Sequence, residues 1–121
     1  MEKDIKAILR HKRVFEAQSQ MLRKHMKDDR YKISPDTIKK LRDTEDQLSR
    51  ISNWLQILTE DEAFVVQRHL VDGIDLPRVT REYEERWGKD LSKSNRTMKS
   101  YQRRALQKIM RFEKENLTFT E

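Results

Sequence analysis

Basic and amide side chains gather near the C-terminal end of this sequence in a pattern suited to binding a polyanion. Residues 92–112 contain 7 Lys and Arg but no Asp or Glu, whereas residues 58–91 contain 5 basic and 9 acidic residues. Lys and Arg can pair with phosphates or guanine, and Asn can pair with adenine. An acid-free basic segment behind an acidic one therefore indicates nucleic-acid binding, with an ordinary solvated helix face as the alternative.

Helical spacing divides this basic segment into two faces. A buried stripe is predicted at Met98, Tyr101, Ala105, Ile109 and Phe112, which recur three or four residues apart. Near the N-terminal end of the helix, the candidates for base edges or nearby phosphates are Asn95, Arg96, Lys99, Ser100 and Arg103. Further along, the candidates for phosphate contacts alone are Arg104, Lys108 and Arg111. This division predicts which side of the helix would face DNA.

The elements that must position this helix are predicted to be helical as well. Only 2 Gly and 2 Pro occur among 121 residues, and Lys, Glu, Arg, Gln and Leu dominate long stretches. Strand-like alternation of Val, Thr and Ile is absent. The fold class is therefore predicted to be all-α.

The first half of the chain predicts an antiparallel helical hairpin over residues 1–57. One helix is expected over about residues 2–27, followed by a connection at 28–32 and a second helix that Ser34 caps. Lys12, Ser19 and Glu45 interrupt the apolar stripes, so the hairpin should pack on the rest of the chain or on a second copy.

The second half predicts a helix-turn-helix domain over residues 58–113, followed by a frayed tail at 114–121. Thr59 and Glu62 form a capping box, and Gly73 and Gly88 end the next two helices. A loop at 89–93 then leads to Ser94, which caps the basic helix. Short helices followed by a turn and a longer basic helix are typical of a helix-turn-helix unit.

Residues 58–112 resemble region 4 of sigma factors, which binds the promoter −35 element. The resemblance rests on Leu58-Thr59-Glu60 at the start and on the run Thr97–Ile109, which contains Arg104-Ala105. The loop before the basic helix is longer than the usual turn, and nothing upstream resembles region 2. A helical N-terminus with such a unit is similar to ArpU and RinA-type phage late-gene regulators. The resemblance implies a transcription regulator that activates phage or mobile-element promoters, with RNA polymerase as a further partner.

Other residue types favour structural roles. His11, His25 and His69 lack metal-ligand spacing, and we expect no metal, cofactor or enzymatic activity. We expect Trp54 and Trp87 to anchor the core, and the acidic residues Glu82, Glu84 and Glu85 to form a solvated face. Core positions are expected for Met21, Met26, Met98 and Met110.

The predicted function is sequence-specific binding of double-stranded DNA in transcription regulation. The chain lacks an apolar run of roughly 18 residues and a recognisable signal peptide, so a cytoplasmic protein without a membrane partner is expected. The absence of cysteine excludes disulfides and by itself leaves the compartment open. One alternative is a DNA-packaging adaptor similar to small terminase subunits, which form oligomers. The other is a regulator that binds RNA polymerase without DNA specificity of its own.

Overall fold

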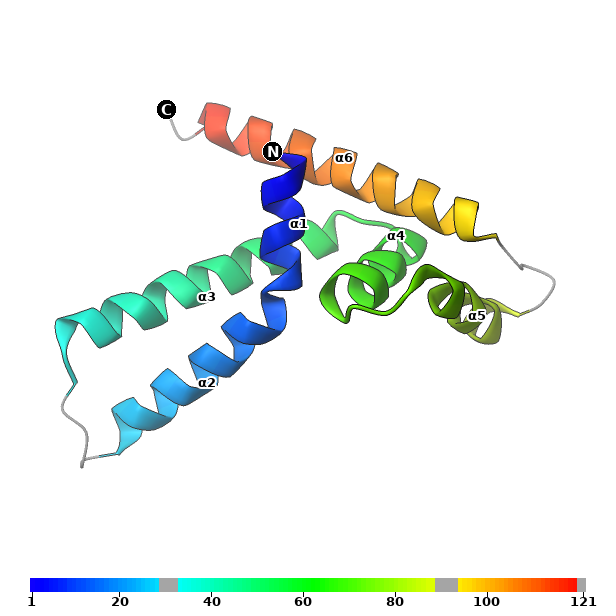
Figure 1. The fold of residues 1–121 in the computed structure, drawn as a ribbon. Coiled ribbons are helices and arrows are strands. Elements are labelled where there is room, and N and C mark those ends of the chain that lie inside the picture. The colour runs from blue at the N-terminus through cyan, green and yellow to red at the C-terminus, as the bar shows by residue number, and fades with distance from the viewer. Residues whose placement is uncertain (29–32, 89–93, 120–121) are drawn as a thin grey trace.

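Helices make up the secondary structure of every described range, which confirms the predicted all-α class. The structure is a computed structural model that describes residues 1–28, 33–88 and 94–119. In chain order the elements are α1 (Glu2–Arg10), α2 (Lys12–Lys27), α3 (Pro35–Gln56), α4 (Glu60–Val65), the π-helix η1 (Val66–Val71), α5 (Leu76–Trp87) and α6 (Asn95–Phe119) (Figure 1). The expected connection at 29–32 and the loop at 89–93 lie outside the described residues.

The expected single helix over residues 2–27 is wrong, because the chain turns at His11. The backbone N–H of His11 donates to the carbonyl oxygens of Ala7 and Ile8, and α2 then begins at Lys12. α2 lies along α3 in the opposite direction, whereas α1 turns away to contact α6 and η1 (Figure 1). A straight helix could not pack on both sets of neighbours, and the turn allows each half to bury its own apolar residues.

Predicted helix boundaries are confirmed where local chemistry determines them. The hydroxyls of Ser34, Thr59 and Ser94 each accept a hydrogen bond from the backbone N–H three residues later. Glu62 returns a hydrogen bond to the backbone N–H of Thr59 at 2.9 Å, which completes the capping box. Gly73, after η1, has a φ of +73°, a left-handed conformation that other residues rarely adopt.

The larger hydrophobic core joins both halves of the chain. Its buried members are Ile5 and Leu9 of α1, Ile51 and Trp54 of α3, Val66, Leu70 and Val71 of η1, and Ala105, Leu106 and Ile109 of α6. Trp54 is completely buried, as predicted. The core therefore continues across the boundary expected at residues 57 and 58.

A second, smaller core joins α4, α5 and α6. Its buried members are Val65, Val79, Tyr83 and Met98, with Phe64, Trp87 and Tyr101 packed around them. The rings of Tyr83 and Trp87 stack with centroids 4.4 Å apart. Along α6 the predicted stripe is confirmed, since Met98, Ala105 and Ile109 are buried and Tyr101 and Phe112 are partly buried. α6 therefore contributes to both cores.

α6 continues to Phe119, past residue 114, where the tail was expected to begin. Glu113 is buried and accepts hydrogen bonds from Trp54 Nε1 at 2.5 Å and from Arg50 Nε and Nη2 at 2.9 and 3.0 Å. The Arg50 hydrogen bonds hold the pKa of Glu113 below its ordinary value, although burial opposes the shift. These contacts fasten the C-terminal part of α6 to α3.

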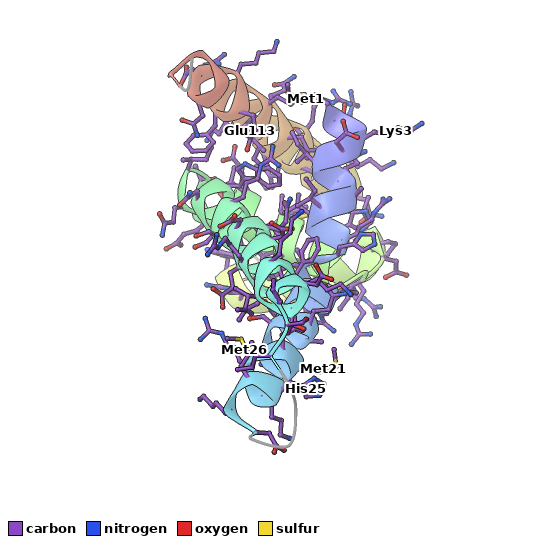
Figure 2. The ribbon with its side chains drawn as sticks, turned by 90° about the vertical axis from the view of Figure 1, so that its left-hand side faces the viewer. Met1, Lys3, Met21, His25, Met26 and Glu113 are labelled. Carbon is purple, nitrogen blue, oxygen red and sulfur yellow. The ribbon has the colours of Figure 1, made fainter. Side chains whose placement is uncertain are left out.

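Met21 is 51% exposed, so its expected place in the core is wrong. Met98 is buried, and Met26 and Met110 are partly buried. Figure 2 shows Met21 and Met26 on opposite sides of α2. No described helix is both long enough and apolar enough to cross a membrane.

Candidate nucleic-acid interface

The exposed face of α6 presents a continuous row of basic side chains. At about 100° per residue, the row occupies roughly 140° of the helix circumference. Its exposed cations are Arg96, Lys99, Arg103, Arg104 and Arg111. Ser100 lies in the same arc and is exposed too. We call this surface the basic face of α6, and it lies opposite the stripe that α6 buries.

Most cations of the basic face have no partner among the described residues. Within those ranges, no carboxylate is within ion-pair distance of Arg96, Lys99, Arg103 or Arg111. The guanidinium of Arg104 lies 5.8 Å from the ring centroid of Tyr101, a cation–π contact that leaves its charge uncompensated. Several like charges held on one helix face repel one another, and a bound polyanion would relieve that repulsion.

Asn95, the first residue of α6, is partly engaged within the protein. Its Oδ1 atom accepts a hydrogen bond from the hydroxyl of Thr80 in α5 at 2.6 Å. Thr80 is buried, and its hydroxyl also lies 2.9 Å from the carbonyl oxygen of Leu76. This contact ties the start of α6 to α5, and it leaves the side-chain N–H groups of Asn95 as the donors available to a ligand.

Lys108 differs from the other candidate cations because its amine bonds within the protein. Nζ lies 2.7 Å from Oε1 of Glu62, which is only 1% exposed. Burial raises the pKa of Glu62, but hydrogen bonds from Lys108 and from the backbone and hydroxyl of Thr59 outweigh it and hold the pKa below its ordinary value. The sequence pattern identified Glu62 only as a capping residue, so this partner was missed. Because its amine is engaged by Glu62, Lys108 is not among the cations available to a ligand.

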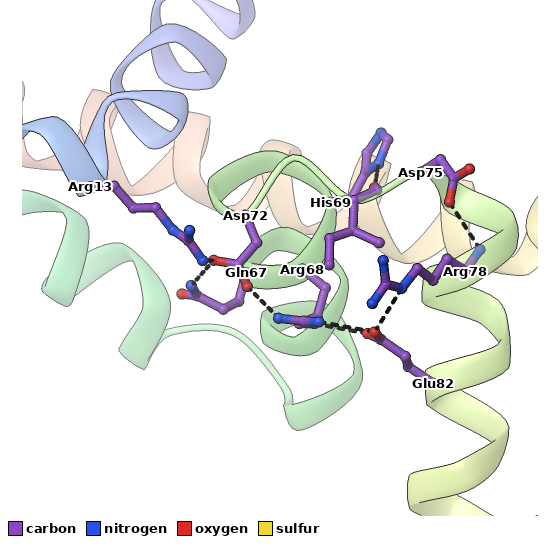
Figure 3. A network of polar contacts seen from close by, with 9 residues as sticks. Arg13, Gln67, Arg68, His69, Asp72, Asp75, Arg78 and Glu82 are labelled. Carbon is purple, nitrogen blue, oxygen red and sulfur yellow. Dashed lines mark hydrogen bonds and ion pairs between the residues drawn. The ribbon is translucent and has the colours of Figure 1, made fainter.

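A network of charged residues joins α2, η1 and α5 (Figure 3). Arg68 donates two hydrogen bonds to Glu82 at 2.8 and 2.9 Å and one to Asp72 at 2.8 Å. Arg13 of α2 donates to the other oxygen of Asp72 at 2.6 Å. Glu82 was expected on a solvated face; its side chain is 22% exposed, and it also pairs with Arg68 of η1, a partner that the sequence did not indicate.

The charges of this network stabilise one another. Burial raises the pKa of Asp72, but hydrogen bonds from Arg13 and Arg68 outweigh it and keep the pKa below its ordinary value. The hydrogen bond from Arg68 likewise lowers the pKa of Glu82. In return, Glu82 and Asp72 raise the pKa of Arg68. The network is therefore fully charged at neutral pH, and it fixes the helices that support α6.

No family model matches the chain, and no curated protein or solved structure matches it. Across the part of the chain that the structure describes, no three His, Asp or Glu side chains lie close enough together to hold a metal ion. Among the described residues of the chain, the basic face of α6 is the most distinctive arrangement.

Proposed function

We propose that this chain binds double-stranded DNA through the basic face of α6 and regulates transcription. The observation that carries the proposal is the contrast between the two sides of α6. One side is buried in both cores, and the other presents cations that no described carboxylate neutralises. α4 with η1, α5 and α6 would form the helix-turn-helix unit, and α6 would enter the major groove.

The exposed residues divide by their position along α6. Arg96, Lys99, Ser100 and Arg103 lie within the first turns, where a recognition helix meets base edges. Arg104 and Arg111 lie further along or at the flank, where phosphates are the nearer partners. The N-terminal end of the helix at Ser94 and Asn95 adds its positive dipole to the attraction for a phosphate.

The regulatory part of the proposal is supported by the resemblance of residues 58–112 to region 4 of sigma factors. By that resemblance the DNA would be a promoter of a phage or related mobile element, and RNA polymerase would be a further partner. A packaging adaptor would use the same basic face on non-promoter DNA. Its oligomeric state would differ, because a ring of eight or more subunits favours packaging, whereas a monomer or dimer favours regulation.

Salt dependence tests DNA binding directly. If four cations of the basic face contact phosphates, log affinity should fall with log salt at a slope of roughly 3.6. Raising salt from about 50 to 200 mM would then weaken binding to duplex DNA on the order of 100-fold. Fluorescence anisotropy with a labelled duplex measures this slope. Undetectable binding at low salt, or binding that salt does not weaken, would contradict the proposal.

A pair of matched double variants locates the binding surface. Arg96→Glu with Arg103→Glu should abolish binding, because both cations lie on the basic face. Lys39→Glu with Lys40→Glu changes the net charge equally at exposed positions of α3 and should have a much smaller effect. Equal losses in the two double variants would show that net charge alone governs binding. Genome-wide mapping of bound sites would then show whether they are promoters.

A further inference from the structure

The outward face of α2 carries apolar side chains that the fold does not use. Val14 is 48% exposed and Met21 is 51% exposed, and the two lie seven residues apart on the same side of the helix. Ala17 lies between them, and together with Arg13 and Gln18 these residues line a shallow hollow on the surface. We call these five residues the α2 outer face.

The α2 outer face does not pack against α3. The side of α2 that is turned toward the protein carries Phe15, Leu22 and Met26, all partly buried. Met21 projects from α2 on the side away from Met26 (Figure 2). An apolar strip with the spacing i, i+3, i+7 is the pattern by which one helix receives another. These exposed apolar side chains do not stabilise the fold, whereas a partner could bury them.

Charge indicates the nature of that partner. Of the five cations of α2, Lys12 lies 3.6 Å from Glu16, and Arg13 and Arg23 pair with Asp72 and Glu45. Lys24 and Lys27 are the two without a carboxylate partner among the described residues. Arg13 is held in place by Asp72, so its position beside the hollow is fixed. Lys24 and Lys27 are exposed on the same flank of the helix as Arg13. The surroundings of the α2 outer face are therefore basic.

We propose that the α2 outer face docks an acidic amphipathic helix of a partner protein. The apolar side of such a helix would cover Val14, Ala17 and Met21, and its carboxylates would face Lys24 and Lys27. A second copy of this chain fits less well, because it would bring one basic α2 against another. An anionic membrane also fits less well, since the strip is narrow and holds no aromatic side chain that could enter the lipid interface.

This surface is separate from the basic face of α6. In Figure 1, α6 runs along the top of the molecule and α2 lies at the lower left, with α3 between them. DNA on α6 would therefore leave the α2 outer face open to a partner. The proposal does not depend on DNA binding, and either can fail without the other.

A synthetic helix of defined charge tests the proposal on the full chain. The probe is a fluorescent peptide of about 18 residues with Leu at helical spacing and Glu on the remaining face, long enough to fold on a surface. Its control has Lys in place of every Glu. The acidic probe should bind with a micromolar Kd that weakens as salt rises, whereas the basic control should bind at least about 10-fold more weakly.

Exposed substitutions then locate the binding surface. Val14→Lys and Met21→Lys should each weaken binding of the acidic probe about 10-fold, because each places a charge within the apolar strip. Ile38→Lys is the matched control, since Ile38 of α3 is 41% exposed and lies outside the α2 outer face. Circular dichroism of each variant should match that of the parent, because all three positions are exposed.

Several results would overturn the proposal. Equal binding of the acidic and basic peptides would remove the role of charge, and unchanged binding by Met21→Lys would place the site elsewhere. A concentration-dependent dimer that Met21→Lys dissociates would make a second copy the occupant. Binding to phosphatidylserine-containing vesicles, lost in the same variant, would make a lipid surface the occupant. Sedimentation velocity and vesicle flotation distinguish these last two results.

Discussion

Arginines of the supporting helices and arginines of the basic face of α6 have opposite electrostatic surroundings. Arg68 contacts two carboxylates, and Arg50 makes two hydrogen bonds to Glu113. Arg96 and Arg103 meet no carboxylate among the described residues. The net charge of +6 does not reveal this difference, because it counts both kinds of cation equally. Pairing separates the cations that hold the fold together from those that are available to a ligand.

Separating the two halves of the chain should destabilise the fold more than any single substitution. A fragment of residues 1–57 loses η1 and α6, so Ile5, Leu9 and Trp54 lose their neighbours in the larger core, and Arg13 loses Asp72. We expect the fragment to lack a cooperative thermal transition by circular dichroism or to self-associate. A monomeric fragment with a cooperative transition would show that the hairpin folds without the supporting network.

Arg68→Ala should lower the free energy of unfolding by about 2–3 kcal/mol. It removes two charge-assisted hydrogen bonds to Glu82 and one to Asp72, while Arg13 still pairs with Asp72. The Asp72 side chain is only 7% exposed, so water cannot fully replace the lost hydrogen bond. Urea denaturation measures the change. Arg103→Ala is the matched control, and it should change the same free energy by less than about 0.5 kcal/mol. Similar losses in both variants would contradict the division into paired and unpaired cations.

Arg103→Ala, which should barely change stability, should clearly weaken DNA binding. On a preferred duplex selected from a random pool, it should cost about 1–3 kcal/mol, with a much smaller loss on scrambled DNA. The reason is that Arg103 is exposed within the first turns of α6 and has no competing partner in the described part of the chain. Anisotropy titrations of both duplexes measure the two losses. Equal losses would mean that α6 contacts only the DNA backbone.

Acid should lower the free energy of unfolding, because the paired carboxylates become protonated. Folding lowers the pKa values of Glu62, Asp72, Glu82 and Glu113. A carboxyl whose pKa is lowered by folding contributes stability above its unfolded pKa and loses it as pH falls through the folded pKa. Stability should therefore be constant above about pH 5 and decline below about pH 4. Urea midpoints across this range test the trend, which Arg68→Ala should make shallower.

Lys108 and Arg111 provide the finest test, because they lie three residues apart on α6. Arg111→Ala should weaken binding to preferred and scrambled DNA by a similar small amount and reduce the salt slope by about one. Lys108→Ala should leave the slope unchanged and lower stability instead, because its amine bonds Glu62. A reduced slope in Lys108→Ala would return that residue to the interface.

The features that could be predicted from the sequence are those that depend on neighbouring residues. The caps at Ser34, Thr59 and Ser94 require only a hydroxyl and the backbone N–H three residues later. The buried stripe of α6 follows from helical spacing, and so does the exposure of the opposite side. These signals were sufficient to place Arg96 and Arg103 on a solvent-exposed face.

Features that depend on distant partners could not be predicted in this way. Glu113 is buried because Trp54 and Arg50 lie about 60 residues away in sequence but beside it in the fold. Lys108 is engaged by Glu62 in the same manner. The turn at His11 arises because α1 and α2 pack on different neighbours, and the local sequence holds only an interrupted apolar stripe at Lys12, with no Gly or Pro to mark a break. Tertiary packing therefore decided each of these cases.

α6 spans both cores as one uninterrupted helix, so it can act mechanically as a lever. Arg96 and Glu113 are separated by about 26 Å along its axis at 1.5 Å per residue. With the end at Glu113 as pivot, a tilt of about 5° would move Arg96 by roughly 2 Å, which is comparable to the difference between a hydrogen bond and none. Repacking of α1 or α3 against the C-terminal part of α6 would therefore shift the arginines only by also moving Met98 in the smaller core and the Asn95–Thr80 contact.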